Sequence, residues 1–535
     1  MSLTSFYFLV FLFGVIVTYY LVPKKYQWCV LLAASYGFYL SSGIPQVLYI
    51  IGTTLFTYGA GRWMQKLRDD FQNQLNGLSG DVTIEQKREM KKLVNARIHR
   101  IQVYAVLANL IVLACVKYLN LFIGNINDIF SFFRWDASMP MVNILVPLGL
   151  SYYTFNSIGY LIDVGRGKHA AEKHLGKFAL FVSFFPSIVQ GPLFRYKDVG
   201  MQLQAPHALE YNNLKFGAQL VLWGFFKKLV IADRVAAIAA TVFAPGFVDY
   251  TGSHVFVGVL AYSFQIYCDF SGGTDITRGV AQMMGIDLPV NFARPFFATS
   301  MADFWRRWHM SLGAWMREFV FYPIMLCKPV TALSKYFRKR YGSYAGKMVP
   351  SVAAPMVVFF LIGIWHNITS QYIVNGLYNA ILISSSVALA PVYKKLAEKL
   401  HVNTESFAFR LFQMLRTFVL LCFSRIIVKA PSLADAMKMI KSLFTGWDLR
   451  FLTGADGMIF QYGVTDRDLI LLAVSILLLL VIGILQERGV KIRKSLSRKP
   501  LVVRWSAVLA LLTAVLIFGV YGPAYDARSF IYGAF

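Results

Sequence analysis

Long apolar segments alternate with short polar segments along the whole chain. The first apolar run, Leu3 to Val22, has about 20 residues, which is the length that a helix needs to cross a bilayer. No basic segment precedes this run and no small-residue cleavage site follows it, so we predict an uncleaved span. Further runs occupy 26–43, 45–61, 101–123, 141–162, 175–193, 216–245, 254–268, 351–390, 411–428, 469–486 and 503–521. The pattern predicts an all-α polytopic membrane protein with roughly 11–13 transmembrane or re-entrant helices.

The composition agrees with this membrane class and excludes others. Apolar residues make up 57% of the 535 residues and charged residues only 15%, with a mean hydropathy of +0.53. Water-soluble proteins carry about 25% charged residues, and disordered chains have far fewer aromatic residues. The net charge of +26 is spread over many loops, with no hydrophilic basic domain, so no nucleic-acid partner is expected. The five cysteines lie in separate segments without metal-ligand spacing, so neither a disulfide framework nor a metal site is expected.

Basic residues concentrate in a few loops and predict the orientation of the chain. Nine lie within 62–100, six within 328–347 and seven within 488–504, and the last two segments contain no acid. Lysine and arginine are enriched in cytoplasmic loops, so these loops, with two smaller lysine groups, are assigned to the cytoplasm. Counting the spans between them then places both termini outside. The excess positive charge also predicts contact with anionic membrane lipid.

The middle of the chain carries charged residues where hydropathy predicts membrane. Lysines and acids interrupt 216–245, and arginines and a histidine occur within 286–309. Polar groups at this depth are tolerated when protein encloses them or when they line a watery cavity. We therefore predict one integral domain over 1–535, with an enclosed core at about 145–370 and flanking spans at 1–123 and 411–521. Transporters and membrane-embedded enzymes both have this layout.

Two histidines follow a tryptophan within apolar surroundings, His309 in WRRWH and His366 in GIWHN. One such histidine is usually a buried, hydrogen-bonded core residue, but two in matching contexts beside intramembrane arginines favour a chemical role. The segment 303–322 is predicted to be one amphipathic helix, with Asp303 and Arg307 paired at i, i+4. Gly272 and Gly273 indicate a turn. No Walker loop, GxSxG or HExxH motif is present.

Several blocks together resemble one known family. They are VPLGLSYYTFNSIGYLIDVGRG at 146–167, FFPSIVQGPLFRY at 184–196, GFFKKLVIADR at 224–234, LAYSFQIYCDFSGGTDITRGVAQMMGIDLPVNFARPF at 260–296, FWRRWHMSLGAWMREFVFYPI at 304–324 and GIWHN at 363–367. In this order they resemble the membrane-bound O-acyltransferase (MBOAT) family. The similar branch is the bacterial one, which includes the alginate O-acetylation membrane subunit and the D-alanyl transfer membrane protein of teichoic acid modification. Relatives often have glycine at the position of Asn367.

The resemblance implies a fold, a site and a set of co-substrates. The implied fold is a ring of transmembrane helices around a thin core with a central tunnel, in a bacterial cytoplasmic membrane. His366 is the implied principal catalytic residue and His309 its partner. The candidates for positioning substrate are Trp305, Arg306, Asn367, Asp269 and Asn291. No tightly bound cofactor and no metal is implied, and the acyl donor is a thioester on coenzyme A or on an acyl carrier protein.

The function that follows is transfer of an acyl group, with acetyl favoured, from a cytoplasmic thioester across the membrane to an exported cell-surface polysaccharide. An extracytoplasmic SGNH-type acyltransferase is the implied partner. The chemistry needs a base for the acceptor hydroxyl and stabilisation of an oxyanion, for which His366 and His309 have suitable side chains. The alternatives are D-alanyl transfer from a carrier protein to teichoic acid, a proton-coupled transporter or flippase, and a non-catalytic scaffold. The transporter predicts inverted repeats, which the sequence does not display.

Overall fold

The computed structural model describes residues 1–77, 83–144, 146–246, 251–448, 450–451, 458–521 and 530. Helix accounts for 79% of the chain, and no strand occurs in the part that the structure describes. The predicted all-α class is therefore confirmed. The C-terminal segment that the sequence assigns to the outside lies mostly beyond the described residues.

The chain divides into two compact units by its internal contacts. The first unit comprises Met1–Ala218 and Thr277–Pro289, and the second comprises Gln219–Ile276 and Val290–Phe535. Spanning helices occur in both units, and the single integral domain stays a prediction.

In the described ranges, six helices are long and apolar enough to cross a membrane, or seven if a bent pair counts as one span. The six are α4 (Ile84–Phe132), α11 (Gly252–Met283), α15 (Lys328–His366), α18 (Phe407–Lys429), α21 (Asp466–Glu487) and α23 (Leu501–Phe518), and the pair, bent by 58°, is α16 (Ser370–Ala388) with α17 (Ala390–Lys399). A polytopic membrane protein is thus confirmed, and α1 (Phe6–Leu21) is a shorter apolar helix within the first predicted span.

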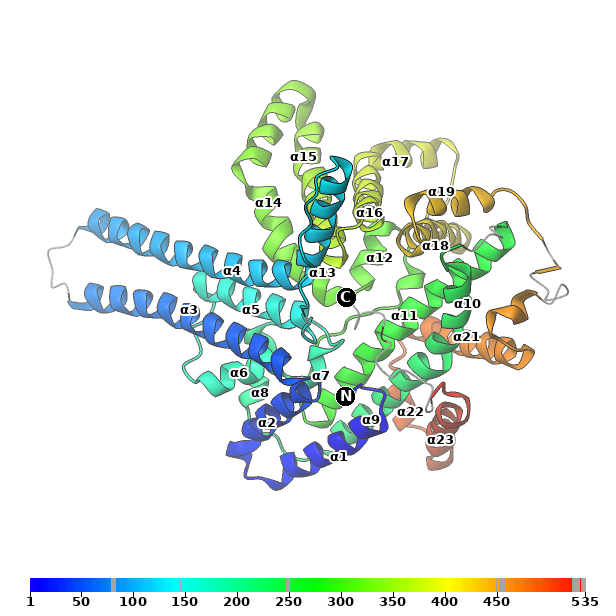
Figure 1. Cartoon of the computed structure of the whole chain (residues 1–535), viewed down its shortest axis with the longest axis horizontal. Coiled ribbons are helices and arrows are strands. Elements are labelled where there is room, and N and C mark those ends of the chain that lie inside the picture. The colour runs from blue at the N-terminus through cyan, green and yellow to red at the C-terminus, as the bar shows by residue number, and fades with distance from the viewer. Residues whose placement is uncertain are drawn as a thin grey trace. The chain divides into compact units, whose positions relative to one another are not determined.

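The first unit packs its helices around α5 (Leu150–Gly165). Residues 150–164 are all buried, because α5 lies against α3 (Ile44–Gly77), α4 and α6 (Leu175–Ser183). Figure 1 shows α3 and α4 as a long pair side by side. One charge in this core is neutralised, since Arg195 Nε donates to the buried Asp163 carboxylate at 3.0 Å. The other helices of this unit are α2 (Gln27–Leu40), α7 (Phe185–Ile188), α8 (Met201–Gln204) and most of α9 (Tyr211–Phe225).

The second unit contains the polar segment that interrupts the apolar run 216–245. The residues Phe226–Ala232 form a π-helical turn between α9 and α10 (Asp233–Val242). Its two lysines are buried, and each is paired: Lys227 Nζ lies 2.8 Å from Asp275, and Lys228 Nζ lies 2.6 Å from Asp269. These partners stand on α11, which is why the charges are tolerated within a membrane protein.

The turn predicted at Gly272 and Gly273 is wrong, because both residues lie inside α11. The glycine here serves close packing instead of a turn. A Cβ atom on Gly224 would lie 2.7 Å from the Gly272 carbonyl oxygen, so only small residues allow α9 to approach α11.

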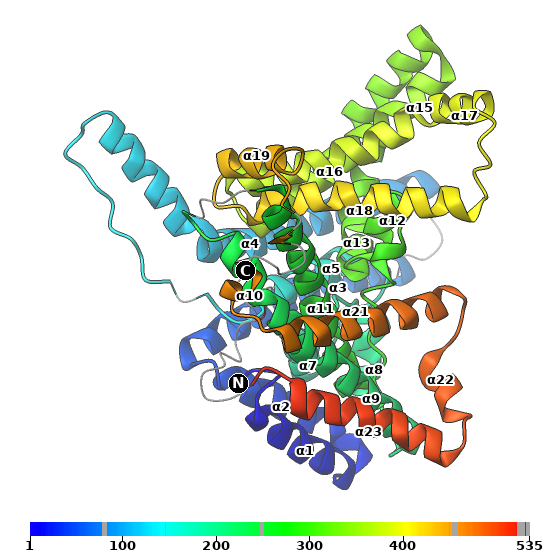
Figure 2. The same cartoon turned by 90° about the vertical axis from the view of Figure 1, so that its right-hand side faces the viewer.

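The functional residues of the second unit are held by α15, α16 and α18. Figure 2 shows α16 and α18 side by side, and α15 packs on α16. Gly363 and Gly376 allow this α15–α16 contact, since a Cβ atom on either would lie within 2.6 Å of a backbone carbonyl oxygen of the other helix. The remaining helices of the unit are α12 (Met301–Arg307), α13 (Met310–Met316), α14 (Tyr322–Leu326), α19 (Leu433–Ser442) and α22 (Ile492–Ser497).

Replacing Gly376 by alanine should destabilise the protein by about 1–3 kcal/mol, the usual range for overpacking a tight contact. The new Cβ atom would lie 2.4 Å from the Phe359 carbonyl oxygen, which cannot move without shifting α15. Thermal unfolding of the purified protein measures the effect. Gly37→Ala is the matched control, because nothing lies within 4 Å of its Cβ position. An equal melting temperature for both variants would contradict the close contact.

Candidate active site

The WRRWH segment is the place where two short helices meet. Helix α12 ends at Arg307 and α13 begins at Met310. The predicted single helix over 303–322 is therefore wrong, although the Asp303–Arg307 pair within it is confirmed at 3.1 Å. The break is at His309. Its φ of 44° and ψ of 52° lie in the left-handed region, which residues other than glycine and asparagine rarely adopt.

A neighbouring stretch of extended chain explains why the helix stops here. The Ala293 N–H donates to the Arg307 carbonyl at 2.9 Å, and the Met310 N–H donates to the Asn291 carbonyl at 2.9 Å. These bonds satisfy backbone groups that an interrupted helix would leave without partners. Tertiary pairing with residues 291–293 therefore overrides the local preference for helix.

The Asn291 side chain fixes the orientation of the His309 ring. Its Oδ1 accepts hydrogen bonds from the Ser311 N–H at 3.1 Å and from the Ser311 hydroxyl at 2.8 Å. A backbone N–H can only donate, so this atom of Asn291 is the carbonyl oxygen. The His309 Nδ1 atom lies 3.1 Å from the same oxygen and must therefore carry the proton. The neutral His309 ring consequently has its lone pair on Nε2.

His309 is enclosed by apolar and aromatic groups. It is 3% exposed, and its ring makes an edge contact with Phe270 at 4.8 Å between centroids. His309 lies between α12 and α13, outside the spanning helices. Burial there disfavours the charged form and lowers the pKa of the imidazole to about 3. His309 is therefore neutral at physiological pH.

One cavity, which we call the His309 pocket, adjoins this residue. It has a volume of about 200 Å³ and a mostly apolar lining, with Arg306 and Arg317 as its charged residues. Both arginines are exposed. The lining comprises Ala302, Trp305, Arg306, Trp308, His309, Leu312, Gly313, Met316, Arg317, Phe321, Pro355, Val358, Phe359, Ile362 and Ile383. The pocket therefore combines an apolar wall with two cationic side chains.

A second cavity, the His366 pocket, is smaller and more polar. It has a volume of about 100 Å³. The His366 ring stacks on Tyr372 with centroids 5.9 Å apart. The lining comprises Tyr262, Ile266, Phe304, Trp305, Trp308, Phe359, Ile362, Gly363, His366, Tyr372, Asn375, Gly376, Asn379, Leu421, Ser424, Arg425 and Val428. A histidine, two amides and three hydroxyls thus converge on one small space.

Hydrogen bonds between α12, α16 and α18 organise the His366 pocket. The Trp305 Nε1–H donates to Asn379 Oδ1 at 3.1 Å, and the Ser424 hydroxyl donates to Asn375 Oδ1 at 2.6 Å. Asn379 Nδ2 in turn lies 3.3 Å from the Ser424 oxygen. Satisfied polar networks of this kind hold side chains in one arrangement.

The two pockets lie one above the other along α15 and α16. On α15, Pro355 and Val358 line only the His309 pocket, whereas His366 lines only the other. The order on α16 is reversed, with Asn375 in the His366 pocket and Ile383 in the His309 pocket. The pockets share four lining residues, which are Trp305, Trp308, Phe359 and Ile362. The His309 pocket thus lies toward the basic ends of these helices.

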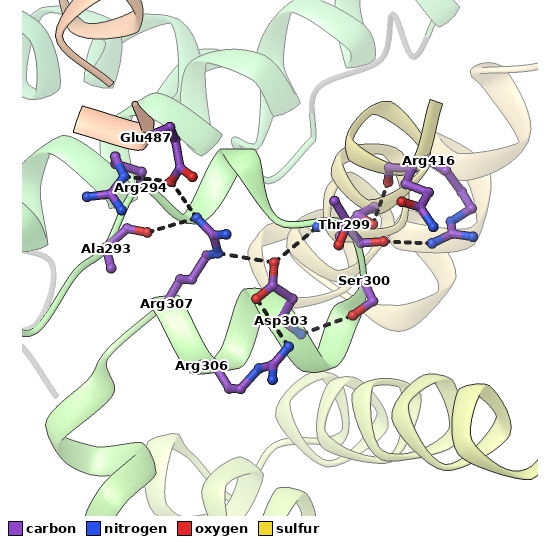
Figure 3. A network of polar contacts seen from close by, with 11 residues as sticks. Ala293, Arg294, Thr299, Ser300, Asp303, Arg306, Arg307, Arg416 and Glu487 are labelled. Atoms are coloured by element: carbon purple, nitrogen blue, oxygen red, sulfur yellow. Dashed lines mark hydrogen bonds and ion pairs between the residues drawn. The ribbon is translucent and has the colours of Figure 1, made fainter. Parts of the chain in front are cut away.

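Charged side chains of α12 form a network with Glu487 in the last turn of α21 (Figure 3). Asp303 accepts hydrogen bonds from Arg306 at 3.3 Å and from Arg307 at 3.1 Å. Glu487, the last residue of α21, accepts from Arg307 at 2.5 Å and from Arg294 at 2.6 Å. Glu487 therefore connects the two chain segments that meet at the His309 turn.

Replacing Glu487 by glutamine should lower acyl transfer about fivefold, which corresponds to about 1 kcal/mol for a partly exposed ion pair. The physical reason is that Arg294 and Arg307 would lose the carboxylate that holds their segments together. The initial rate with a thioester donor measures the effect. Glu398→Gln is the control, because Glu398 makes only an exposed pair with Lys394 at 3.9 Å. Equal rates for both variants would contradict the positioning role.

The structure places the predicted site residues in three groups. Trp305 lines both pockets, Arg306 lines the His309 pocket, and Asn291 contacts His309. Asn367 ends α15, with its N–H bonded to the Gly363 carbonyl at 3.1 Å, and lines neither pocket. Asp269 pairs with Lys228 and also lies outside both linings.

Sequence reasoning missed much of the polar lining of the His366 pocket. Asn375, Asn379 and Ser424 had no recognisable motif, since isolated polar residues are common in spanning helices. Arg425 did carry a signal, because it is a charge inside the apolar run 411–428. In the described part of the chain, no group of three His, Cys, Asp or Glu residues could hold a metal ion.

Comparison with known proteins assigns the family. The model of the MBOAT, membrane-bound O-acyltransferase family, matches residues 169–425, which include both histidines and most of the pocket lining. A probable alginate O-acetylase of Pseudomonas aeruginosa is 30% identical over 85% of this chain and 77% of its own length. The chain belongs to the membrane-bound O-acyltransferase family, and it is an O-acyltransferase embedded in the membrane by several helices.

Other relatives differ in the group that they transfer. A peptidoglycan O-acetyltransferase of Helicobacter pylori is 27% identical over 64% of both chains. A teichoic acid D-alanyltransferase of Bacillus subtilis is 32% identical over 46% of this chain and 60% of its own length. The similarity to acetylating relatives thus extends over more of the chain.

Proposed function

We propose that this protein transfers an acetyl group from a cytoplasmic thioester donor across the bacterial cytoplasmic membrane, for O-acetylation of an exported cell-surface polysaccharide. The observation that carries the proposal is the pair of pockets along α15 and α16, with His309 in one and His366 in the other. The extent of similarity to O-acetylases supports acetyl over D-alanyl as the transferred group.

The donor belongs in the His309 pocket. This pocket lies toward the basic ends of α15 and α16, which the distribution of lysine and arginine assigns to the cytoplasm. Its apolar lining and the two arginines are suited to a thioester arm that ends in phosphate. Coenzyme A and an acyl carrier protein both present such an arm. The His309 Nε2 lone pair supports a role as hydrogen-bond acceptor and argues against donation to an oxyanion.

The acceptor hydroxyl belongs in the His366 pocket, on the side away from the basic loops. His366 takes the proton as the hydroxyl oxygen attacks the thioester carbonyl carbon. The C–S bond then breaks, and the proton passes to the leaving thiolate, so that the products are an ester and a free thiol. Asn375, Asn379 and Ser424 are placed to bind the hydroxyl-bearing group. An extracytoplasmic SGNH-type partner would carry the acyl group onward to the polymer.

The test is to offer the purified full-length protein two donors, labelled acetyl coenzyme A and a D-alanyl carrier protein, and to measure thiol release and label transfer. We expect turnover with the acetyl donor and its loss in His366→Ala. Turnover with only the D-alanyl donor would show that D-alanyl, and not acetyl, is the transferred group. No turnover with either donor would contradict the proposed donor chemistry.

A further inference from the structure

Arg425 is a buried cation in the spanning helix α18, and the described residues around it include no counter-ion. Only 7% of the Arg425 surface is exposed. Its Nη1 atom donates to the Ser263 hydroxyl at 2.8 Å, and its guanidinium lies 5.4 Å from the Phe296 ring and 5.8 Å from the Phe418 ring. Among the residues that the structure describes, no carboxylate lies within ion-pair distance of Arg425.

This arrangement is unfavourable for the unliganded protein. Removing a guanidinium from water costs free energy that the Ser263 hydroxyl, a hydrogen bond with Cys422 and two ring faces only partly restore. The other buried cations of the same unit differ, because Lys227 and Lys228 each have a carboxylate within 3 Å. A buried charge that lacks such a partner within a membrane protein is characteristic of a binding or transport function.

The position of Arg425 indicates where its missing partner would lie. It lines the His366 pocket together with Ser424, its neighbour on α18. Among the described residues, no carboxylate lines this pocket. One turn further along α18, Lys429 Nζ lies 5.6 Å from the ring of Tyr262, which lines the pocket as well. The pocket is therefore positively charged on the α18 side.

We infer that Arg425 binds an anionic group carried by the acyl acceptor. The inference rests on the proposed function in one respect, namely that the acceptor occupies the His366 pocket. A cavity of about 100 Å³ has room for several water-sized groups, which is enough for a carboxylate or a phosphate group. Either oxyanion would form charge-assisted hydrogen bonds with the guanidinium. The acceptor is then an acidic molecule, and neutral analogues bind less well.

The test combines a binding measurement with the donor half-reaction. The full-length protein in detergent is unfolded thermally with sodium D-glucuronate, D-glucose 6-phosphate or D-glucose at equal ionic strength. We expect at least one acidic sugar to raise the melting temperature and D-glucose to leave it unchanged. The acidic sugar that acts distinguishes carboxylate from phosphate.

Three variants make this test specific for Arg425. Arg425→Met should lose the shift while its own melting temperature equals or exceeds that of the wild type, because an unpaired buried charge is replaced by an apolar side chain. Arg425→Lys should retain a smaller shift. Arg410→Met, an exposed residue at the start of the same helix, should behave as the wild type.

The donor half-reaction separates this inference from other roles of Arg425. In Arg425→Met, acetyl transfer to the acidic acceptor should fall at least tenfold, and hydrolysis of acetyl coenzyme A without acceptor should fall by much less, because water forms no ion pair with the guanidinium. An equally large loss of hydrolysis in Arg425→Met would assign Arg425 to the reacting carbonyl and overturn the inference. A melting temperature of Arg425→Met below that of the wild type would also overturn it. The same holds if acidic sugar shifts the melting temperature of this variant as much as that of the wild type, or shifts neither. If the wild type transfers the acyl group from neither thioester donor, the proposed function fails, and the binding measurement still decides whether Arg425 holds an anion.

Discussion

Replacing His366 by alanine is expected to lower acyl transfer by about 10³-fold, within the range that a positioned general base contributes. His366 is the histidine of the small polar pocket, where two amides and a serine hydroxyl surround the space for an acceptor. Without it, the hydroxyl would have to attack while still protonated. Single-turnover transfer from a labelled acetyl thioester measures the loss directly.

The fold should survive this substitution. His366 is the last residue of α15, and its ring lines a cavity, so a smaller side chain creates neither a charge nor a tight contact. The melting temperature of His366→Ala should therefore stay close to that of the wild type. His99→Ala is the control, because His99 is exposed in α4. Retained turnover in a folded His366→Ala protein would remove His366 from the mechanism.

The two histidines line adjacent pockets, and the proposed function gives them different tasks. The aromatic residues Trp305 and Trp308 contribute to both linings, so a donor and an acceptor would meet at this shared wall. The proposed reaction, which joins substrates from opposite sides of the membrane, requires such a division. A single pocket with both histidines would expose the thioester to water along with the acceptor.

Much of this could be predicted from local sequence. The apolar runs predicted the spanning helices, because their length is set by the bilayer. The charges of Lys227 and Lys228 marked an interrupted helix, and the structure has a π-helical turn there. The Asp303–Arg307 pair followed from helical spacing alone and is present.

Other features depend on contacts between distant segments, and local sequence does not contain them. The turn at His309 is set by residues 291–293, about 15 positions earlier in the chain, which offer hydrogen bonds to the interrupted helix. Asn367 follows a motif histidine, but its backbone N–H bonds to the last turn of α15 and the residue lines neither pocket. The polar lining of the His366 pocket comes from two further helices whose packing depends on Gly363 and Gly376.

The charge pattern illustrates both situations. Basic loops could be recognised because many like charges occur together. Arg425 is one of four basic residues in the mostly apolar helix α18, and what sets it apart becomes visible only once its surroundings are known. The sequence predicts that such a residue is unusual, whereas the structure shows that Ser263, Phe296 and Phe418 surround it.

Replacing His309 by asparagine is expected to make the protein more resistant to acid while lowering acyl transfer about 10²-fold. In the folded protein, burial lowers the pKa of His309 from 6.5 to about 3. Between these values the unfolded chain binds a proton that the folded protein does not. Stability therefore falls as the pH drops from 6.5 toward 3, and at pH 4.5 the loss is on the order of 3 kcal/mol.

Asparagine is the informative replacement because it tolerates the left-handed backbone that His309 adopts at φ 44°. Its amide can still donate to Asn291, and it does not titrate. The measurement is the melting temperature at pH 7 and at pH 4.5. His309→Asn should lose less stability on acidification than the wild type, whereas His309→Val, which is strained at positive φ, should be less stable at both pH values. If His309→Asn and the wild type lose the same amount, another group controls acid sensitivity and His309 is not the buried neutral acceptor assigned to the donor pocket.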